Sequence, residues 1–297
     1  MTLTKPSPCK VNLLLNILGR RADGFHELET VMQPINLCDE LTFERVAGGI
    51  ALTCSEPALP TDAGNLVQRA AAAFFQRSGL AGGVRMHLEK KIPMAAGLGG
   101  GSGNAATTLL ALNELFGHPL APEALHELAA SLGSDIPFFL QTQPALATGR
   151  GEKIQPLQPF HALEGGAFLL VHPGFGIATA WAYQELARFP QALHGEPGRA
   201  AKLISLLNAG DRRAAGREFY NSLEAPALEK YPWLAVLQDF LRENGAVATL
   251  MSGSGSTTFA ITPDLGGAQE LEERVKGKFG RCWTAVVPVG ESVISNQ

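Results

Sequence analysis

The sequence has little charge, few cysteines and no long apolar run. Charged residues make up 18% of the 297 residues, against about a quarter in an average soluble protein. The net charge is −4, and no block of lysine and arginine is present to neutralise a nucleic-acid backbone. No apolar run reaches the roughly 18 residues that a membrane-spanning helix needs. We therefore expect no nucleic-acid partner and no membrane partner.

The four cysteines exclude a dense disulfide framework and the usual zinc spacings. Cys9, Cys38, Cys54 and Cys282 form no Cys-x-x-Cys pair. The apolar stretch at 13–18 is too short for a secretory signal and follows two prolines and a lysine. Reduced thiols and a soluble cytoplasmic protein are the expectation.

Strands and helices are predicted to alternate along both halves of the chain. Apolar residues at period two or in short β-branched runs predict strands, and apolar residues at helical spacing predict helices. The predicted strands are 10–18, 29–35, 40–46, 84–89, 167–171, 246–250, 258–261 and 281–287. The predicted helices are 65–77, 104–116, 122–132, 179–188, 199–208, 232–244 and 271–279. An unpatterned segment rich in proline and glycine, 156–166, predicts two α+β domains, 1–158 and 159–297.

Glycine is concentrated in one loop, at 93–103, between a predicted strand and a predicted helix. Five of the seven residues at 97–103 are glycine. A backbone without Cβ atoms can approach a ligand closely, and a following helix points free N–H groups into the loop. This arrangement is typical of a phosphate site, although a tight turn without a ligand has the same composition.

Two common phosphate loops fit this segment poorly. A P-loop ends in lysine followed by serine or threonine, but no lysine lies between Lys91 and Lys153. The dinucleotide fingerprint is met only in its weak form, by Gly101, Gly103 and Ala106, and the βαβ unit that should open the chain is missing.

Three motifs, in order, resemble those of the GHMP small-molecule kinases, which include galactokinase, homoserine kinase and mevalonate kinase. They are Lys-Val-Asn-Leu at 10–13, Pro-x-x-x-Gly-Leu-Gly-Gly-Gly-Ser-x-Asn-Ala-Ala at 93–106, and Met-Ser-Gly-Ser-Gly-Ser at 251–256. Three further blocks, 21–28, 134–139 and 148–152, are most similar to the family members that act on a cytidine diphosphate ester of methylerythritol. The block at 21–28, Arg-Ala-Asp-Gly-Phe-His-Glu-Leu, discriminates best.

The chain departs from the usual family pattern at four positions. Cys9 stands where alanine is usual, Phe25 where tyrosine is usual, Gly103 where serine is usual, and Ser222 where aspartate is usual. Phe25 keeps an aromatic face and Gly103 leaves Ser102 intact. The role of the motif around Ser222 is open.

The resemblance implies a fold and an activity. The fold would be the two-domain GHMP kinase fold, with an N-terminal domain like ribosomal protein S5, a ferredoxin-like C-terminal domain and the active site in the cleft between them. The activity would be ATP-dependent phosphorylation of the tertiary 2-hydroxyl of the cytidine diphosphate ester, in the methylerythritol phosphate route to isoprenoid precursors. The chain is expected to be a monomer or a weak homodimer.

The resemblance also implies the ATP site. The phosphates would be held by Pro93, Met94, Ala95, Ala96, Gly97, Leu98, Gly99, Gly100, Gly101, Ser102 and Gly103. Adenine would lie near Asn65, Leu66 and Lys90. Mg²⁺ should accompany ATP, but no carboxylate stands out as its ligand, and Ser102 is the one candidate.

The catalytic pair that the resemblance implies is Asp135 and Lys10. Asp135 would take the proton of the substrate hydroxyl, and the Lys10 cation would keep that carboxylate ionised. The two residues lie 125 positions apart (135 − 10), so their contact comes from the resemblance and not from spacing. On the residues alone, Asp135 could be a helix N-cap or a turn carboxylate, and Lys10 a lysine at a strand edge.

Five residues are implied at the cytidine substrate. Phe25 and Tyr183 would flank the cytosine ring and His26 would read its edge, while Asn12 would bind the sugar alcohol. Thr179, one helical turn before Tyr183, could line the same pocket. Core packing would equally explain Phe25 and Tyr183, and a turn would explain His26.

Three other functions remain open at this level. One is a GHMP kinase of the homoserine or mevalonate type. Another is a sensor that binds a nucleotide without turnover, which the presence of both Lys10 and Asp135 disfavours. The third is a dinucleotide-dependent oxidoreductase.

Overall fold

The computed structural model describes residues 2–290, and these form two compact units. The first unit holds 2–9, Leu37–Pro93 and Gly99–Thr142, and the second holds Lys10–Asn36, Met94–Leu98 and 143–290. Two long strands, β1 (Thr2–Arg20) and β2 (His26–Val46), contribute residues to both units.

The first unit contains β3 (Gly49–Cys54), β4 (Gly83–Glu89) and the second half of β2. Strand β4 pairs antiparallel with β2, from Glu40 opposite Glu89 to Val46 opposite Gly83, and parallel with β3. Alternate residues of β4 are buried, as the period-two pattern predicted for 84–89.

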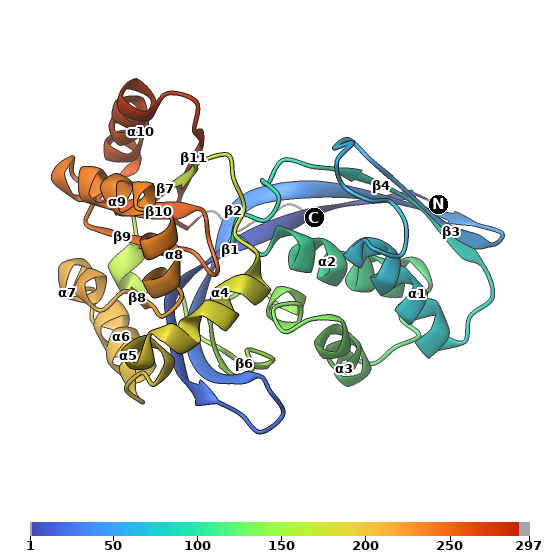
Figure 1. Ribbon diagram of the computed structural model, residues 1–297. Helices are drawn as coiled ribbons and strands as arrows, with labels where there is room; N and C mark the ends of the chain where they lie inside the picture. Colours follow the sequence, from blue (N-terminus) through green and yellow to red (C-terminus); the bar gives the residue numbers. More distant parts are fainter. Residues whose placement is uncertain (1, 291–297) are drawn as a thin grey trace. The chain divides into compact units, whose positions relative to one another are not determined.

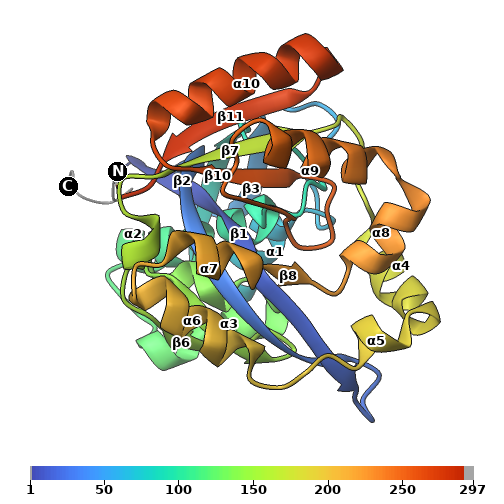
Figure 2. The same ribbon diagram turned by 90° about the vertical axis from the view of Figure 1, so that its left-hand side faces the viewer.

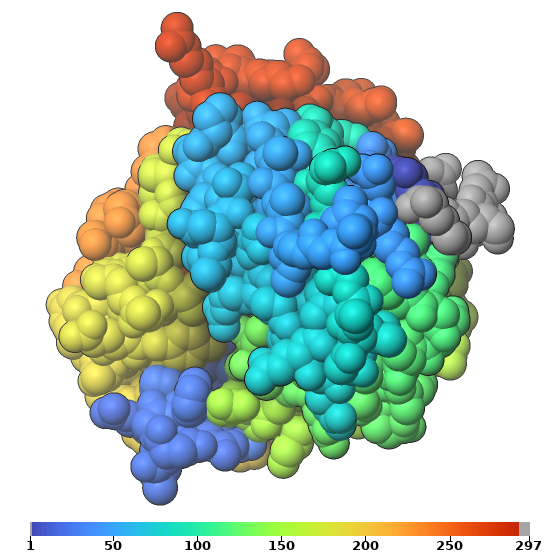
Figure 3. Space-filling model, turned by 90° about the vertical axis from the view of Figure 1, so that its right-hand side faces the viewer, coloured from blue at the N-terminus to red at the C-terminus, as the bar shows by residue number. Residues whose placement is uncertain are grey.

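The helices of the first unit are α1 (Leu66–Ser78), α2 (Gly100–Leu115), α3 (Pro122–Leu132) and the short 3₁₀ helix η1 (Pro137–Leu140). Helices α1, α2 and α3 pack side by side (Figure 1). Figure 3 looks onto the surface of this unit, where the segment from β3 to α1 (blue to cyan) lies next to the α3 region (green).

The second unit contains a four-stranded antiparallel sheet in the order β11-β7-β10-β9. Its strands are β7 (Ala167–His172), β9 (Ala248–Met251), β10 (Thr258–Thr262) and β11 (Trp283–Pro288). Helices α9 (Trp233–Glu243) and α10 (Leu265–Phe279) cover one face of this sheet (Figure 2). Their apolar residues, such as Leu237 and Val275, pack with Leu169 and Val171 into one core.

The remaining strands of the second unit belong to the larger of the two sheets in the described residues, in which β3, β4, β2, β1 and β8 (Tyr220–Asn221) follow one another. Strand β1 pairs in parallel with β8, β2 pairs with β5 (Ala145–Gly149), and β5 pairs with β6 (Lys153–Pro156). The remaining helical elements are η2 (His161–Leu163), α4 (Thr179–Glu185), η3 (Leu186–Arg188), α5 (Pro190–Leu193), α6 (Arg199–Asn208), α7 (Arg212–Arg217) and α8 (Glu224–Lys230).

The structure corrects several predicted elements. The strands predicted at 29–35 and 40–46 are one strand, β2, which continues through residues 36–39; Asp39 in this interval is buried and bonded and does not mark a turn. Helix α2 begins at Gly100 and not at residue 104, and α10 begins at Leu265 and not at residue 271, because glycines hide both starts from the apolar pattern. Strand β1 begins at Thr2, eight residues before the predicted strand.

No helix within residues 2–290 is both long enough and apolar enough to cross a membrane.

Candidate active site

The first half of the glycine-rich loop, Met94–Leu98, lies in the second unit against the loop at 251–257. The Ser252 hydroxyl donates to the Gly97 carbonyl at 2.9 Å, and the Thr257 N–H donates to the Ala96 carbonyl at 3.1 Å. Gly97 has a φ of 76°, and a Cβ there would lie 2.0 Å from the Ser252 carbonyl oxygen. Only glycine permits this approach, so the second glycine-rich loop supports the first.

Lys10 reaches the same half of the loop from β1. Its side chain is buried, and Nζ donates to Asn12 Oδ1 at 2.5 Å and to the Gly97 carbonyl at 3.5 Å. The backbone N–H of Lys10 donates to the Leu98 carbonyl at 2.9 Å. Lys10 is therefore not a solvated lysine at a strand edge: its ammonium group lies beside the glycine-rich loop.

Asn12 is fixed independently of the loop. Its Nδ2 donates to the Thr30 hydroxyl at 2.8 Å, and that hydroxyl donates to the Leu14 carbonyl at 2.5 Å. The bonds join β1 to β2, so Asn12 is held by the sheet and its Oδ1 is presented to Lys10.

The second half of the loop, Gly99–Gly103, lies in the first unit and opens helix α2. Gly99 is the N-cap residue with a φ of 69°, and the Gly103 N–H closes the first helical turn on the Gly99 carbonyl at 2.9 Å. The N–H groups before Gly103 cannot bond within the helix, and they carry the positive end of its dipole. This half of the loop is a suitable site for a phosphate oxygen.

Gly103 also has a packing role in the first unit. A Cβ there would lie 2.5 Å from the Pro8 carbonyl oxygen and 3.3 Å from the Ser7 hydroxyl. A serine at position 103, which is usual in the family, would bring its Cβ into this contact between α2 and the start of β1, whereas glycine fits it.

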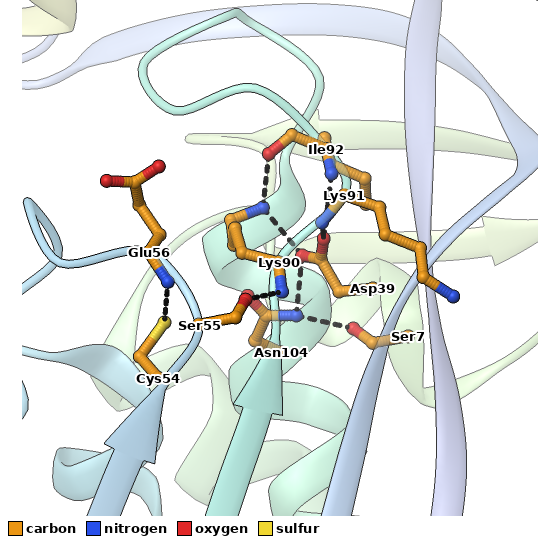
Figure 4. A network of polar contacts seen from close by, with 9 residues as sticks. All are labelled: Ser7, Asp39, Cys54, Ser55, Glu56, Lys90, Lys91, Ile92 and Asn104. Carbon is orange, nitrogen blue, oxygen red and sulfur yellow. Dashed lines mark hydrogen bonds and ion pairs between the residues drawn. The ribbon is translucent and has the colours of Figure 1, made fainter.

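A buried polar network joins the residues just before the glycine-rich loop, 90–92, to Asn104, the residue just after it (Figure 4). The Asp39 carboxylate is fully buried: its Oδ1 accepts the N–H groups of Lys91 and Ile92 at 2.7 and 2.8 Å. Its Oδ2 accepts Lys90 Nζ at 2.7 Å and Asn104 Nδ2 at 3.0 Å. Asp39 thus joins the residues that enter the loop to the first turn of α2. Sequence reasoning did not find Asp39, because its partners at 90–92 and 104 come together with it only on folding.

Two residues predicted near adenine already have bonds within the protein. Lys90 Nζ donates to Ile92 O as well as to Asp39, and only 7% of its side chain is exposed. Asn65 is the N-cap of α1: its Oδ1 accepts the Val67 N–H at 2.9 Å and its Nδ2 donates to the Pro60 carbonyl at 2.7 Å. Leu66 is the first residue of α1. Adenine binding by these three residues stays a prediction.

Asp135 lies in the turn between α3 and η1, in the first unit. It is half-buried and precedes the buried residues Ile136, Pro137 and Phe138. Ile136 is the N-cap residue of η1 and no side chain caps that helix, so Asp135 is not its N-cap. The role of Asp135 as the base and its pairing with Lys10 stay predictions.

The residues predicted at the cytidine substrate lie in the second unit. The ring centroids of His26 and Tyr183 are 5.1 Å apart, with the planes tilted by 37°. Thr179 Oγ1 lies 2.9 Å from Ser254 Oγ, which links α4 to the loop at 251–257. Tyr183 also packs on an apolar core cluster that includes Ala182 and Leu186. Part of its side chain therefore has the core-packing role that the sequence left open as an alternative.

Phe25 lies beside a residue that the sequence did not connect with it. Its ring is 49% exposed, and the Arg150 guanidinium lies 4.6 Å from the ring centroid. Arg150 is in the block at 148–152 that the sequence singled out, but its position on Phe25 could not be read from that block. The structure thus adds Arg150 to the residues around Phe25.

His26 has a pKa below its ordinary value of 6.5, first because of partial burial and second because of the nearby Arg20 cation. The ring is therefore neutral at neutral pH. A neutral imidazole has one donor and one acceptor nitrogen, which suits it to read the edge of a base.

Within the described part of the chain, no three His, Cys, Asp or Glu side chains are grouped to hold a metal ion. Mg²⁺ commonly keeps several waters and binds substrate phosphates with one or two protein oxygens.

Two family models match the chain, one in each half. The model described as "GHMP kinases N terminal domain" matches residues 65–143, and "GHMP kinases C terminal" matches residues 203–281. The first match includes the whole glycine-rich loop and Asp135.

Several curated relatives match almost the whole chain. The 4-diphosphocytidyl-2-C-methyl-D-erythritol kinase of Pelotomaculum thermopropionicum is 41% identical over 277 residues, which cover 93% of this chain and 94% of that one. The protein of the same name from Syntrophotalea carbinolica is 37% identical and covers 96% and 98%.

Solved structures agree with these matches. A 4-(cytidine 5'-diphospho)-2C-methyl-D-erythritol kinase superposes with a TM-score of 0.81 at 35% identity, covering 97% of this chain and all of the other. A homoserine kinase from Cytophaga hutchinsonii superposes with a TM-score of 0.73 at 20% identity, covering 97% and 94%, and shows the fold alone.

Proposed function

Because the chain belongs to the GHMP kinases and, within them, to the 4-diphosphocytidyl-2-C-methyl-D-erythritol kinases, we propose that it phosphorylates the 2-hydroxyl of 4-diphosphocytidyl-2-C-methyl-D-erythritol with ATP. The observation that carries the proposal is the sequence identity of 41% with one of these kinases, over a match that covers 93% of this chain. The buried Lys10 beside the glycine-rich loop agrees with it. The reaction belongs to the methylerythritol phosphate route to isoprenoid precursors. The fold is the α+β GHMP kinase fold that the motifs predicted.

ATP is held by the loop at 93–103. Its glycines bring backbone N–H groups close to the phosphates, and the start of α2 adds a partial positive charge. Mg²⁺ supplies charge neutralisation between the phosphates when bound, with Ser102 as the one protein oxygen that the sequence suggests. Asn65, Leu66 and Lys90 border the adenine.

The cytidine ester is held by residues of the second unit. Phe25 and Tyr183 stack on cytosine, and the neutral His26 bonds its edge. Asn12 binds the methylerythritol part, and Thr179 lines the pocket. The contact of His26 with Tyr183 supports this assignment, because it brings α4 to the residues that follow β1. The contact of Thr179 with Ser254 joins α4 to the loop at 251–257.

Asp135 and Lys10 carry the chemical step. The substrate hydroxyl gives its proton to the Asp135 carboxylate while its oxygen attacks the γ-phosphorus, and the bond from that phosphorus to the β–γ bridging oxygen breaks to release ADP. Lys10 keeps Asp135 ionised and favours the developing alkoxide.

The wider organisation is part of the proposal. The ATP-binding domain is 1–158 and the C-terminal domain is 159–297, and one family-model match falls in each. The protein acts in the cytoplasm, where ATP is available, as a monomer or a weak homodimer.

A substrate panel tests the function. Purified protein with Mg-ATP should release ADP with 4-diphosphocytidyl-2-C-methyl-D-erythritol and less than about 1% as fast with homoserine or mevalonate. Preference for either of those two acceptors, or no ADP with any of the three, would contradict the proposal.

A further inference from the structure

The motif at 221–224, which the function leaves unused, lies directly behind the loop at 251–257. Asn221 is buried, and both N–H bonds of its side-chain amide are used: Nδ2 donates to the Met251 carbonyl at 2.8 Å and to the Gly253 carbonyl at 2.7 Å. Its Oδ1 accepts the Leu223 N–H at 2.9 Å. One side chain therefore fixes two carbonyls of the loop and its own turn.

Glu224 makes a second side-chain hydrogen bond to the backbone of Met251. Its Oε1 accepts the Met251 N–H at 2.8 Å, so both backbone polar groups of Met251 are bonded to side chains of one short motif. Ser222 ties the motif to β1, because its hydroxyl accepts the Ile17 N–H at 3.0 Å and its own N–H donates to the Leu15 carbonyl at 2.8 Å. The motif is thus hydrogen-bonded both to β1 and to the loop at 251–257.

The loop at 251–257 in turn contacts the glycine-rich loop at 93–103 that is proposed to bind phosphate. Ser252, the residue between the two carbonyls that Asn221 holds, donates its hydroxyl to the Gly97 carbonyl at 2.9 Å. The Gly97 backbone lies so close to the Ser252 carbonyl that a Cβ at Gly97 would be 2.0 Å from its oxygen. Asn12 is less dependent on this loop, since Thr30 and the sheet hold it. Lys10 donates to the Gly97 carbonyl that Ser252 also bonds.

We propose that Asn221 is a positioning residue for ATP: it holds residues 251–253 so that Ser252 fixes the Gly97 carbonyl and with it the first half of the phosphate loop. The inference rests on the proposed function. It assigns the motif to the nucleotide. Of the residues proposed at the cytidine ester, Thr179 contacts this loop through Ser254, one residue beyond the segment 251–253 that Asn221 holds.

The test compares Asn221→Ala with a matched control, Asn113→Ala. Asn113 is also a buried asparagine that bonds backbone groups, donating to the Leu120 carbonyl at 3.1 Å and accepting its N–H at 3.0 Å, at the far end of α2 from the glycine-rich loop. Both variants lose similar bonds, so both should lose stability. At equal folded fraction, Asn221→Ala should raise KM for ATP at least tenfold and change KM for the cytidine ester less than about twofold, while Asn113→Ala changes neither by more than about twofold.

Ser252→Ala provides a second measurement if Asn221→Ala folds poorly. It removes one hydroxyl and should raise KM for ATP about fivefold on its own. The double variant Asn221→Ala/Ser252→Ala should be no worse than Asn221→Ala alone, because both changes break the same chain of contacts.

The outcomes separate this inference from the proposed function. If the natural chain releases no ADP with the cytidine ester, the function is wrong. If it is active but Asn221→Ala behaves like Asn113→Ala, or Ser252→Ala leaves KM for ATP unchanged, the positioning role is wrong and the function stands.

Discussion

At the scale of single residues, the account depends on a few buried polar groups whose partners explain them. Lys10 is buried, and an ammonium group removed from water is costly unless hydrogen bonds or charges compensate it. Asn12 Oδ1 and the Gly97 carbonyl provide such bonds, and both lie where a phosphate and an alcohol are proposed to bind. This placement favours a role in catalysis over one in packing.

The role of Asp135 as the base leads to a direct prediction. Asp135→Asn removes the proton acceptor but keeps the shape, so kcat should fall at least about 100-fold, while the Kd for a non-hydrolysable ATP analogue changes less than about threefold. Steady-state kinetics and calorimetric titration measure the two effects. A kcat within about tenfold of the natural chain, roughly 1.4 kcal/mol in the barrier, would rule out the base assignment.

The lowered pKa of His26 predicts the pH dependence of substrate binding. Because the pKa lies below 6.5, the neutral ring persists to a lower pH than in a free histidine, and KM for the cytidine ester should be constant above about pH 6.5. As pH falls through the lowered pKa, protonation removes the acceptor nitrogen and KM should rise. KM measured from pH 5 to 8 should show this acid limb in the natural chain and not in His26→Gln. KM for ATP serves as the control, and an acid limb that persists in His26→Gln would contradict the role.

Sequence reasoning found the residues that carry a family motif and missed those that act through a fold contact. Lys10, His26 and Asp135 stand in recognisable blocks, so the resemblance identified them as candidates. Asp39 and Arg150 have no such signal, because their importance comes from partners that the chain brings together only on folding. The Asp39–Lys90 pair lies 51 positions apart, a separation that no local pattern encodes.

At the scale of elements, the start of α2 shows how packing overrides propensity. Glycine is about 1 kcal/mol less favourable than alanine inside a helix, and the apolar pattern accordingly placed the helix start at 104. The first turn nevertheless includes Gly100 and Gly103 because Ile92 and Pro8 lie where side chains would be. The close approach of neighbouring atoms therefore accounts for glycine at these two positions.

Two glycine substitutions in this turn should have different effects on stability. Gly103→Ala places a Cβ 2.5 Å from the Pro8 carbonyl, so the free energy of unfolding should fall by at least about 1 kcal/mol. At Gly101 the nearest atom to an added Cβ is Leu66 Cδ1 at 3.7 Å, so Gly101→Ala should be neutral or stabilising by up to about 1 kcal/mol. Urea unfolding measures both. Equal effects from the two variants would show that packing at Gly103 is not the reason for that glycine.

Strand β2 shows the limit of the apolar pattern for strands. The two apolar stretches were predicted correctly in position, but the polar interval between them was taken to be a break. The backbone continues through Asp39 because the carboxylate has four donors within the first unit and needs no solvent. A buried, fully bonded aspartate cannot be told from a turn aspartate without the fold.

At the scale of the whole molecule, the order of motifs was enough to predict the fold class and the activity. Three short blocks resembling one kinase family, in the family's order, implied two α+β domains, and the family models and relatives confirm this. The extent of β1 and β2 could not be predicted, because each strand contributes residues to both compact units. Local patterning describes segments, whereas this feature depends on which segments pair.

Transfer of phosphate from ATP to the 2-hydroxyl of the cytidine ester can be tested by identifying the product. Phosphorus NMR of a reaction with Mg-ATP and 4-diphosphocytidyl-2-C-methyl-D-erythritol should show one new phosphate monoester resonance, formed in equal amount to ADP, while the diphosphate signals of the ester persist. The new phosphorus should couple to no proton across a P–O–C–H path, since the 2-carbon is tertiary. ADP without a monoester, or a monoester coupled to such a proton, would contradict the account.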